Sequence, residues 1–309
     1  MNNRSLYLLS FLSLALAPAL AWAQGSAAGP GTTPPSTQAI GGALVMKGST
    51  NLYVAENTTL VTTEIDNGIT ANIENHGTIQ CSGNWINNGT MTERTGIVVL
   101  NGGGSGCLQG TTKFNDLTID KDLSSLHVDI NHSGSGGDQY ILGTLKLNSG
   151  RLDLSASLAA DSLILLSDNL GTARIAAVET NGSLIGDFVM QRYITGNDDW
   201  RLLSAPVATA TLDDWENEIH MSCIEGHSVH TAPHWTSVYR YSEATPGDSS
   251  FGWTESTSPS THAGTVNYTE TLDPRTGYLV YVASGTGTTT FTADLKGTLE
   301  TGKSLGERQ

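Results

Sequence analysis

Cysteine is scarce in this chain, which has three among its 309 residues. So few cysteines exclude the disulfide-dense framework of a small secreted domain. Cys81 and Cys107 both lie in a repeated region and are candidates for a disulfide between successive coils, if the chain folds in an oxidising compartment. Cys223 is then the odd thiol, either buried or a candidate metal ligand.

Basic residues are also few, with 15 Lys and Arg against 30 Asp and Glu and a net charge of −15. Such a surface repels phosphate backbones, so nucleic acid is not an expected partner. An acidic surface favours solubility, and the attraction of Ca²⁺ is the alternative reason for it.

Long hydrophobic runs are absent after residue 23, so no integral membrane segment is expected in the mature chain. The one apolar run, Leu6–Leu20, follows Arg4 and precedes an A-W-A cleavage site at residues 21–23, as in a secretory signal peptide. A membrane anchor is the alternative, but the run is short and contains Pro18. We therefore expect residues 1–23 to be removed and the chain to be secreted or displayed at the cell surface.

One short phrase recurs with variations: an apolar residue, Asn, Gly, usually Thr, then an apolar strand. It is written IDNGIT, IENHGTI, INNGTM and VVLNGGG between residues 65 and 104. Asn and Gly tolerate the left-handed backbone of tight corners, and the apolar residues between corners can stack inward. This repetition is typical of a β-solenoid, in which each coil buries its apolar face against its neighbours.

The repeats predict an all-β chain that begins with an irregular right-handed β-solenoid over residues 39–187. It follows a flexible Pro- and Thr-rich leader at residues 24–38. The Gly-Thr pairs recur at uneven intervals, so the coils should differ in size. Gly77 and Gly89 are expected to occupy corners with positive φ, where valine would be strained.

The sequence pattern changes near Phe188, where the Asn-Gly phrases end, and this change predicts a second domain over residues 188–309. Four of the six tryptophans follow within a short stretch, and residues 201–204, 238–241 and 278–282 resemble strands. We expect an antiparallel β-sandwich-like module. One helix is expected where Thr211 and Asp214 form a capping box, with Leu212, Trp215 and Ile219 at helical spacing.

Histidine and cysteine crowd into fifteen residues of this second region as a candidate zinc cluster, which comprises His220, Cys223, His227, His230 and His234. Imidazole and thiolate groups suit Zn²⁺, and four ligands complete a structural site. No HExxH or paired CxxC spacing is present, so a solvated histidine-rich loop is the alternative.

A candidate calcium loop resembles the opening of an EF-hand, with oxygen-bearing residues at Asp129, Asn131 and Ser133, followed by Gly134. Its twelfth position is Tyr140 where a bidentate Glu is required, and an Asx-rich turn is the alternative. The expectation is therefore no cofactor, with Ca²⁺ or Zn²⁺ as alternatives.

Catalytic motifs are not evident, because the sequence around Ser228 lacks the second glycine of a nucleophile elbow. Carboxylates beside basic residues, as at a polysaccharide lyase or hydrolase site, are found at Asp120, Asp122 and Asp153 with Lys121 and Arg151. Solvent-facing charges on alternating strands are the simpler interpretation. The tryptophans from Trp200 to Trp253 are either a sugar-stacking platform or core residues.

Two stretches resemble known surface proteins. GNWINNGTMTERTGIVVLNG followed by KFNDLTID is similar to the repeats of large secreted surface proteins of Bacteroidetes. MQRYITGNDDWRLLSAPV, and TGYLVYV and FTADLKGTLETG after it, resemble the β-rich module that follows such repeats. The resemblance implies export by the type IX secretion system and display at the cell surface. Those proteins end in a C-terminal sorting domain, which the residues up to Gln309 do not resemble. The second module is therefore expected to be truncated, and a different route to the outer membrane is the alternative.

The resemblance carries no catalytic residues onto this sequence. The expected function is a secreted or surface-displayed structural or adhesive protein without catalytic activity. The alternative is a carbohydrate-binding or polysaccharide-degrading surface protein. Expected partners are surface glycans, other cell-surface proteins and the secretion machinery.

Overall fold

The computed structural model describes residues 36–92, 95–130, 137–155, 163–196, 198–216, 219, 238–241, 252–255, 271–282 and 290–300. The chain divides into two compact units, one comprising residues 1–164 and 173–185 and the other residues 165–172 and 186–309. The signal peptide and most of the expected leader lie outside the described residues. Strand β1 begins at Ser36, so the end of the segment assigned to the leader is already β-structure.

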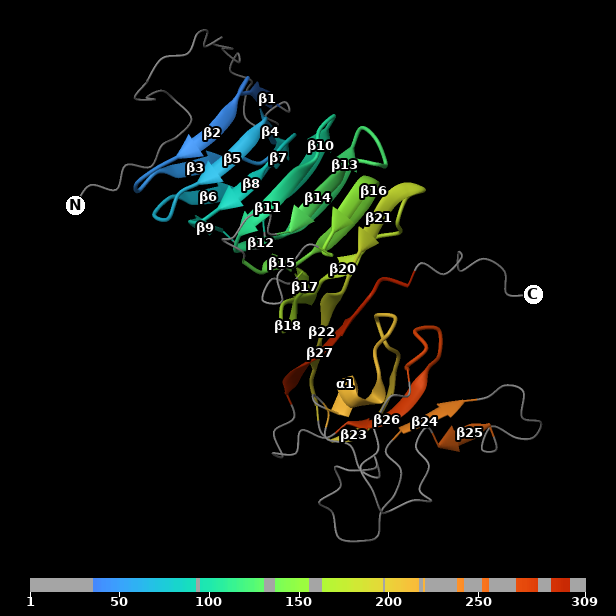
Figure 1. Cartoon of the computed structure of the whole chain (residues 1–309). Coiled ribbons are helices and arrows are strands. Elements are labelled where there is room, and N and C mark those ends of the chain that lie inside the picture. Colours follow the sequence, from blue (N-terminus) through green and yellow to red (C-terminus); the bar gives the residue numbers. More distant parts are fainter. Residues whose placement is uncertain are drawn as a thin grey trace. The chain divides into compact units, whose positions relative to one another are not determined.

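The first unit is a parallel β-solenoid of about six coils, in which three strands of each coil stack on those of the next (Figure 1). The first wall contains β1 (Ser36–Ala39), β4 (Thr58–Thr62), β7 (Thr78–Cys81), β10 (Ile97–Gly102), β13 (Asp116–Lys121), β16 (Thr144–Asp153) and β20 (Arg174–Ile175). The second wall contains β2 (Ala43–Met46), β5 (Glu64–Asn67), β8 (Trp85–Asn87), β11 (Gly106–Gly110), β14 (His127–Ile130), the end of β16, and β21 (Asn181–Ile185).

The third wall is built from short strands, namely β3 (Asn51–Val54), β6 (Asn72–Asn75), β9 (Thr90–Met91), β12 (Thr112–Phe114), β15 (Gln139–Ile141) and β17 (Leu163–Leu165). The parallel pairing confirms the predicted solenoid, and no helix occurs among its described residues. Its irregularity is also confirmed. The stretch of chain that separates Leu117 from its partner Leu145 is longer than the stretch that separates Thr78 from its partner Ile97.

Strand alternation sends every second side chain into the solenoid, where apolar residues of successive coils stack. Ile65, Trp85 and Leu108 align on neighbouring strands of the second wall, and all three are fully buried. The Trp85 ring lies 5.4 Å from the ring of Phe114, and its Nε1–H donates to Thr112 Oγ1 at 3.1 Å. The indole therefore fills the interior without leaving its one donor unpaired.

The asparagines of the repeated phrase act through their side chains rather than through a left-handed backbone. Asn67 and Asn87 align on β5 and β8, are buried, and share a hydrogen bond of 2.7 Å from Nδ2 of Asn67 to Oδ1 of Asn87. Nδ2 of Asn87 donates in turn to the carbonyl of Thr111 at 3.0 Å. Positive φ among the described non-glycine residues occurs at Asn57 and Thr209 instead. The expected corner role of these asparagines was therefore wrong.

Gly77 and Gly89 recur in the phrase for a different reason from the expected positive φ, which neither has. A Cβ atom on Gly77 would collide with the carbonyl oxygens of Thr58 and Ala55. A Cβ on Gly89 would collide with the carbonyl oxygen of Ala71 and lie 2.5 Å from the carbonyl oxygen of Gly68. Glycine is needed because the backbones of successive coils approach closely there.

Strand β16 passes from the first wall to the second without interruption. Its beginning pairs with β13 and its end with β14, and Gly150 between them has a φ of 89°. Leu145, Leu147, Leu152 and Leu154 are all buried, as their alternation predicted.

The second unit contains antiparallel sheets, as expected. A hairpin joins β18 (Ser167–Asp168) to β19 (Gly171–Thr172), and β22 (Phe188–Ile194) pairs with β27 (Phe291–Gly297). A four-stranded sheet has the order β23 (Asp199–Leu203), β26 (Tyr278–Val282), β24 (Val238–Tyr241), β25 (Trp253–Glu255).

The single helix among the described residues, α1 (Leu212–Glu216), begins at the predicted capping box. Asp214 Oδ2 accepts the backbone N–H of Thr211 at 2.7 Å, and Thr211 Oγ1 accepts that of Asp214 at 3.4 Å. Leu212, Trp215 and Ile219 are buried, which confirms the helical spacing.

Candidate functional site

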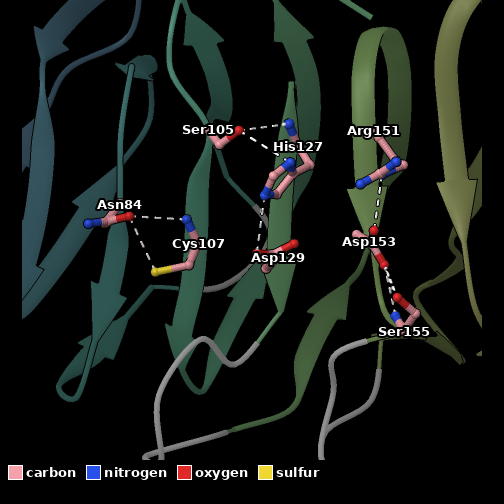
Figure 2. Close-up of polar contacts among 8 residues, drawn as sticks. All are labelled: Asn84, Ser105, Cys107, His127, Asp129, Arg151, Asp153 and Ser155. Carbon is pink, nitrogen blue, oxygen red and sulfur yellow. Dashed lines mark hydrogen bonds and ion pairs between the residues drawn. The ribbon is translucent and has the colours of Figure 1, made fainter. Parts of the chain in front are cut away.

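A row of polar side chains crosses the outer face of the second solenoid wall (Figure 2). Val128 and Leu152 are fully buried, so the residues on either side of each point outward. In-register pairing then aligns Cys107 with Asp129 and Asp153 on β11, β14 and β16. We call this set the polar row, and it comprises Asn84, Ser105, Cys107, His127, Asp129, Arg151, Asp153 and Ser155.

Within the polar row, His127 lies between a hydroxyl and a carboxylate. Its Nδ1 is 3.3 Å from Ser105 Oγ, and its Nε2 is 3.5 Å from Asp129 Oδ2. The backbone N–H of His127 also donates to Ser105 Oγ at 3.2 Å. A nucleophile, a base and an orienting acid have this order in Ser-His-Asp enzymes. Here both side-chain distances exceed the usual reach of about 2.6–3.2 Å, and Ser105 is exposed.

Asp153 is held by its neighbours as a carboxylate. Oδ2 is 3.0 Å from Nε of Arg151, and Oδ1 accepts the backbone N–H and the hydroxyl of Ser155 at 3.0 and 2.5 Å. Burial by itself would raise the pKa of Asp153, but the Ser155 hydrogen bonds and the charges of Arg151 and His127 lower it below its usual value. Asp153 is therefore ionised at neutral pH and is unsuited to act as a general acid.

Replacing Asp153 with Asn should lower the melting temperature at pH 7 by about 2–4 °C, for a loss of about 1 kcal/mol. Because the folded-state pKa is depressed, the contribution of Asp153 is present above its unfolded pKa near 4 and is lost as the pH falls through the folded value. Thermal melts at pH 7 and pH 2.5 should thus differ less in the variant than in the wild type. The exposed Asp120, replaced with Asn, is the control, and an equal pH response in both variants would contradict the assignment.

The expected disulfide between Cys81 and Cys107 is not formed, and both are free, buried thiols. Cys81 lies two residues after Ile79 on β7, so its side chain points into the solenoid as that of Ile79 does. Its Sγ lies 3.3 Å from the carbonyl oxygen of Asn84. Cys107 belongs to the outward polar row, with Sγ 3.3 Å from Asn84 Oδ1. The two side chains leave their walls in opposite directions, so a bridge would require backbone movement.

Burial raises the pKa of both thiols, and the charge of Asp129 adds to the effect at Cys107. We therefore expect iodoacetamide to leave Cys81 and Cys107 unmodified in the native protein and to modify both once the chain is unfolded without reductant. Peptide mass spectrometry identifies each modified site. A disulfide-linked peptide pair containing Cys81 and Cys107 in the unreduced digest would refute the free-thiol assignment.

The metal candidates are not assembled in the part of the chain that the structure describes. All five residues of the zinc cluster, and Asn131, Ser133 and Gly134 of the calcium loop, lie outside the described residues. Asp129, the remaining loop residue, faces His127. Among the described residues, no three His, Cys, Asp or Glu side chains are grouped to hold a metal ion.

The other charged candidates separate onto different surfaces. Asp153 and Arg151 do form an ion pair on the second wall, whereas Asp120 and Asp122 are exposed at the end of β13 on the first wall. Lys121 was expected to face solvent, which is wrong. It is 1% exposed, and its Nζ donates to the carbonyl oxygens of Ser82 at 3.0 Å and Asn101 at 2.7 Å.

Burial lowers the pKa of Lys121, while the two carbonyl oxygens satisfy two of its three N–H donors and tie three successive coils together. Sequence alternation contains the signal for this placement, because Lys121 continues the parity of Leu117 and Ile119. The sequence contains no such signal for the Ser105–His127 contact. The two residues are 22 positions apart, and they meet only because the coil between them has this length.

Searches of protein-family models, curated proteins and solved structures find no match for this chain. None of the helices in the described part is long and apolar enough to cross a membrane.

Proposed function

We propose that this protein is exported and serves as a structural or adhesive component outside the cell or at its surface, without catalytic activity. One observation carries the proposal. Polar groups of the second wall are bound to one another, as in the Arg151–Asp153–Ser155 cluster, while most of the large apolar side chains of the described coils are buried in the interior. A stack of this kind holds its two ends apart as a stiff, hydrated spacer.

The signal-peptide pattern at residues 1–23 supports export. The resemblance to Bacteroidetes surface proteins supports the type IX system as the route, with the secretion machinery, surface glycans and other surface proteins as partners. We further assign a right-handed coil to the solenoid, since crossovers between parallel strands are almost always right-handed. The antiparallel sheets of the second unit support a sandwich-like module.

A polysaccharide-degrading role is the second candidate, and the alignment of Asp129 with Asp153 on adjacent strands favours it. Paired carboxylates are the catalytic groups of most glycosidases. The ion pair of Asp153 with Arg151 and its lowered pKa weigh against a proton-donating role.

Two assays test the proposal. Fractionation of cells that express the full chain should recover a product lacking residues 1–23 outside the cytoplasm. The purified protein should release no reducing ends, unsaturated sugars or acids from panels of polysaccharides and esters. Cytoplasmic retention of the intact chain would contradict export. Turnover that disappears in both Asp153→Asn and His127→Ala would establish the enzymatic alternative.

A further inference from the structure

One face of the four-stranded sheet in the second unit carries aromatic rings. On β26, Tyr278, Val280 and Val282 are buried, so Leu279 and Tyr281 belong to the opposite face. Antiparallel register places residues of β23, β24 and β25 beside them. We call this set the aromatic face, and it comprises Trp200, Leu202, Tyr239, Tyr241, Trp253, Leu279 and Tyr281.

The aromatic face reaches solvent. Trp200 is 37% exposed, Tyr241 41% and Leu202 72%. This contrasts with Trp215, which is 3% exposed and packs edge-on against Tyr278 at 5.5 Å. Among the described tryptophans of the second unit, Trp215 thus belongs to the core and Trp200 to the surface.

Ring-to-ring contacts fix the surface aromatics in place. The Trp200 ring lies 5.5 Å from that of Tyr281 and 5.7 Å from that of Tyr239. Tyr241 and Trp253, an in-register pair, have ring centres 5.1 Å apart. Gly252 lies under the Tyr241 ring, where any Cβ atom would collide with it. A pre-ordered platform of this kind loses little side-chain entropy when a ligand covers it.

Charge identifies the class of ligand. All seven side chains of the aromatic face are uncharged, and the one charged residue that the same register places beside them, Glu255 opposite Tyr239, is acidic. The whole chain has a net charge of −15, so a polyanionic partner is disfavoured. Aromatic rings offer flat apolar surfaces, and tyrosine hydroxyls add hydrogen-bonding groups at their edges. Pyranose rings match both features, because they combine an apolar C–H face with hydroxyl edges.

We propose that the aromatic face binds a neutral polysaccharide, with sugar rings stacked on Trp200 and on the Tyr241–Trp253 pair. This site rests on the proposed adhesive function and gives it a ligand class. It requires no catalytic group, and every residue of the site belongs to one sheet.

Affinity electrophoresis of the full mature chain tests the site, with β-glucan, xylan, galactomannan or polygalacturonate cast into native gels. At least one of the three neutral polymers should retard the wild type, and polygalacturonate should not. Trp200→Ala and Tyr241→Ala should each weaken the dissociation constant about tenfold, as expected for the loss of one stacking contact worth about 1.4 kcal/mol. Trp200→Phe should retain most of the binding. Tyr53→Ala, which removes a 40% exposed ring from the solenoid, is the matched control and should bind as the wild type does.

The proposal is overturned if no neutral polymer retards the wild type, or if Tyr53→Ala weakens binding as much as Trp200→Ala. It is also overturned if sedimentation shows a dimer that Trp200→Ala dissociates, because a second copy would then occupy the aromatic face. Far-UV circular dichroism of each variant identifies unfolding, and Tyr241→Ala carries the test if Trp200→Ala fails to fold. Export and the absence of turnover are measured separately, so failure of glycan binding leaves the proposed function standing.

Discussion

Replacing Gly89 with Val should lower the melting temperature of the solenoid by about 6–12 °C, for a loss of about 3 kcal/mol or more. The reason is that the valine side chain would collide with two carbonyl oxygens that accept backbone hydrogen bonds. The carbonyl oxygen of Ala71 accepts the N–H of Thr90 at 3.0 Å, and that of Gly68 accepts the N–H of Ala71 at 2.9 Å. A side chain at residue 89 would have to displace both acceptors.

Gly104→Val is the matched control, since a Cβ there meets no atom within 4 Å. Thermal denaturation followed by far-UV circular dichroism compares the two variants with the wild type. We expect Gly104→Val to melt within about 1–2 °C of the wild type, as surface substitutions generally do. Equal melting temperatures for Gly89→Val and Gly104→Val would contradict the close approach of successive coils at Gly89.

Replacing Trp85 with Ala should cost about 3–5 kcal/mol and lower the melting temperature by about 6–20 °C. Trp85 is the largest fully buried side chain among the described residues, so its removal leaves a cavity between Ile65 and Leu108 that the neighbouring coils cannot close. It also removes the ring contact with Phe114 and the hydrogen bond to Thr112.

Two further variants separate these contributions. Trp85→Phe keeps an aromatic ring but loses the N–H donor, so it should fall between the wild type and Trp85→Ala. Leu123→Ala removes an apolar side chain that is 61% exposed and should change the unfolding free energy by less than about 0.5 kcal/mol. Urea denaturation gives the three values. A loss at Leu123→Ala as large as that at Trp85→Ala would refute the interior position of Trp85.

The solenoid was predictable because its signals are local and repeated. Apolar alternation in each strand and the recurring Asn-Gly phrase both indicate a coil of the solenoid. In the second unit, the capping box of Thr211 and Asp214 is a local signal of the same kind and marks the one helix of the described residues. The physical roles within the phrase were less predictable. A glycine required for close backbone approach and a glycine required for positive φ look identical in sequence, and only the neighbouring coil distinguishes Gly89 from Gly150.

The polar row could not be predicted, because coil length decides which outward residues become neighbours. The stretch of chain between the aligned residues Asp129 and Asp153 is longer than the stretch between Ile97 and its partner Asp116. A shift of one residue in either coil would bring different side chains beside His127. For the same reason, the sequence placed Cys81 and Cys107 in neighbouring coils but did not reveal that they point to opposite sides of their walls.

The aromatic face depends on pairing between distant strands in the same way. Trp200 and Tyr281 are far apart in the sequence and meet only through the register of β23 with β26. The sequence identified a tryptophan-rich region but did not show which of its rings are buried and which are exposed. The structure buries Trp215 and exposes Trp200.

The stiff stack of coils is the central claim, and one distance tests it most directly. Ala43, Asp153 and Ile185 belong to one row across the second wall, in which Ala43 and Ile185 are six strand spacings apart. At about 4.8 Å per spacing, the two positions should lie about 29 Å apart. Spin labels on cysteines introduced at Ala43 and Ile185, with the three native cysteines replaced by Ser, make this distance measurable by pulsed electron paramagnetic resonance. We predict one narrow distribution centred at about 29 Å, whereas a broad distribution, or one centred below about 20 Å, would contradict the parallel stack and the spacer function built on it.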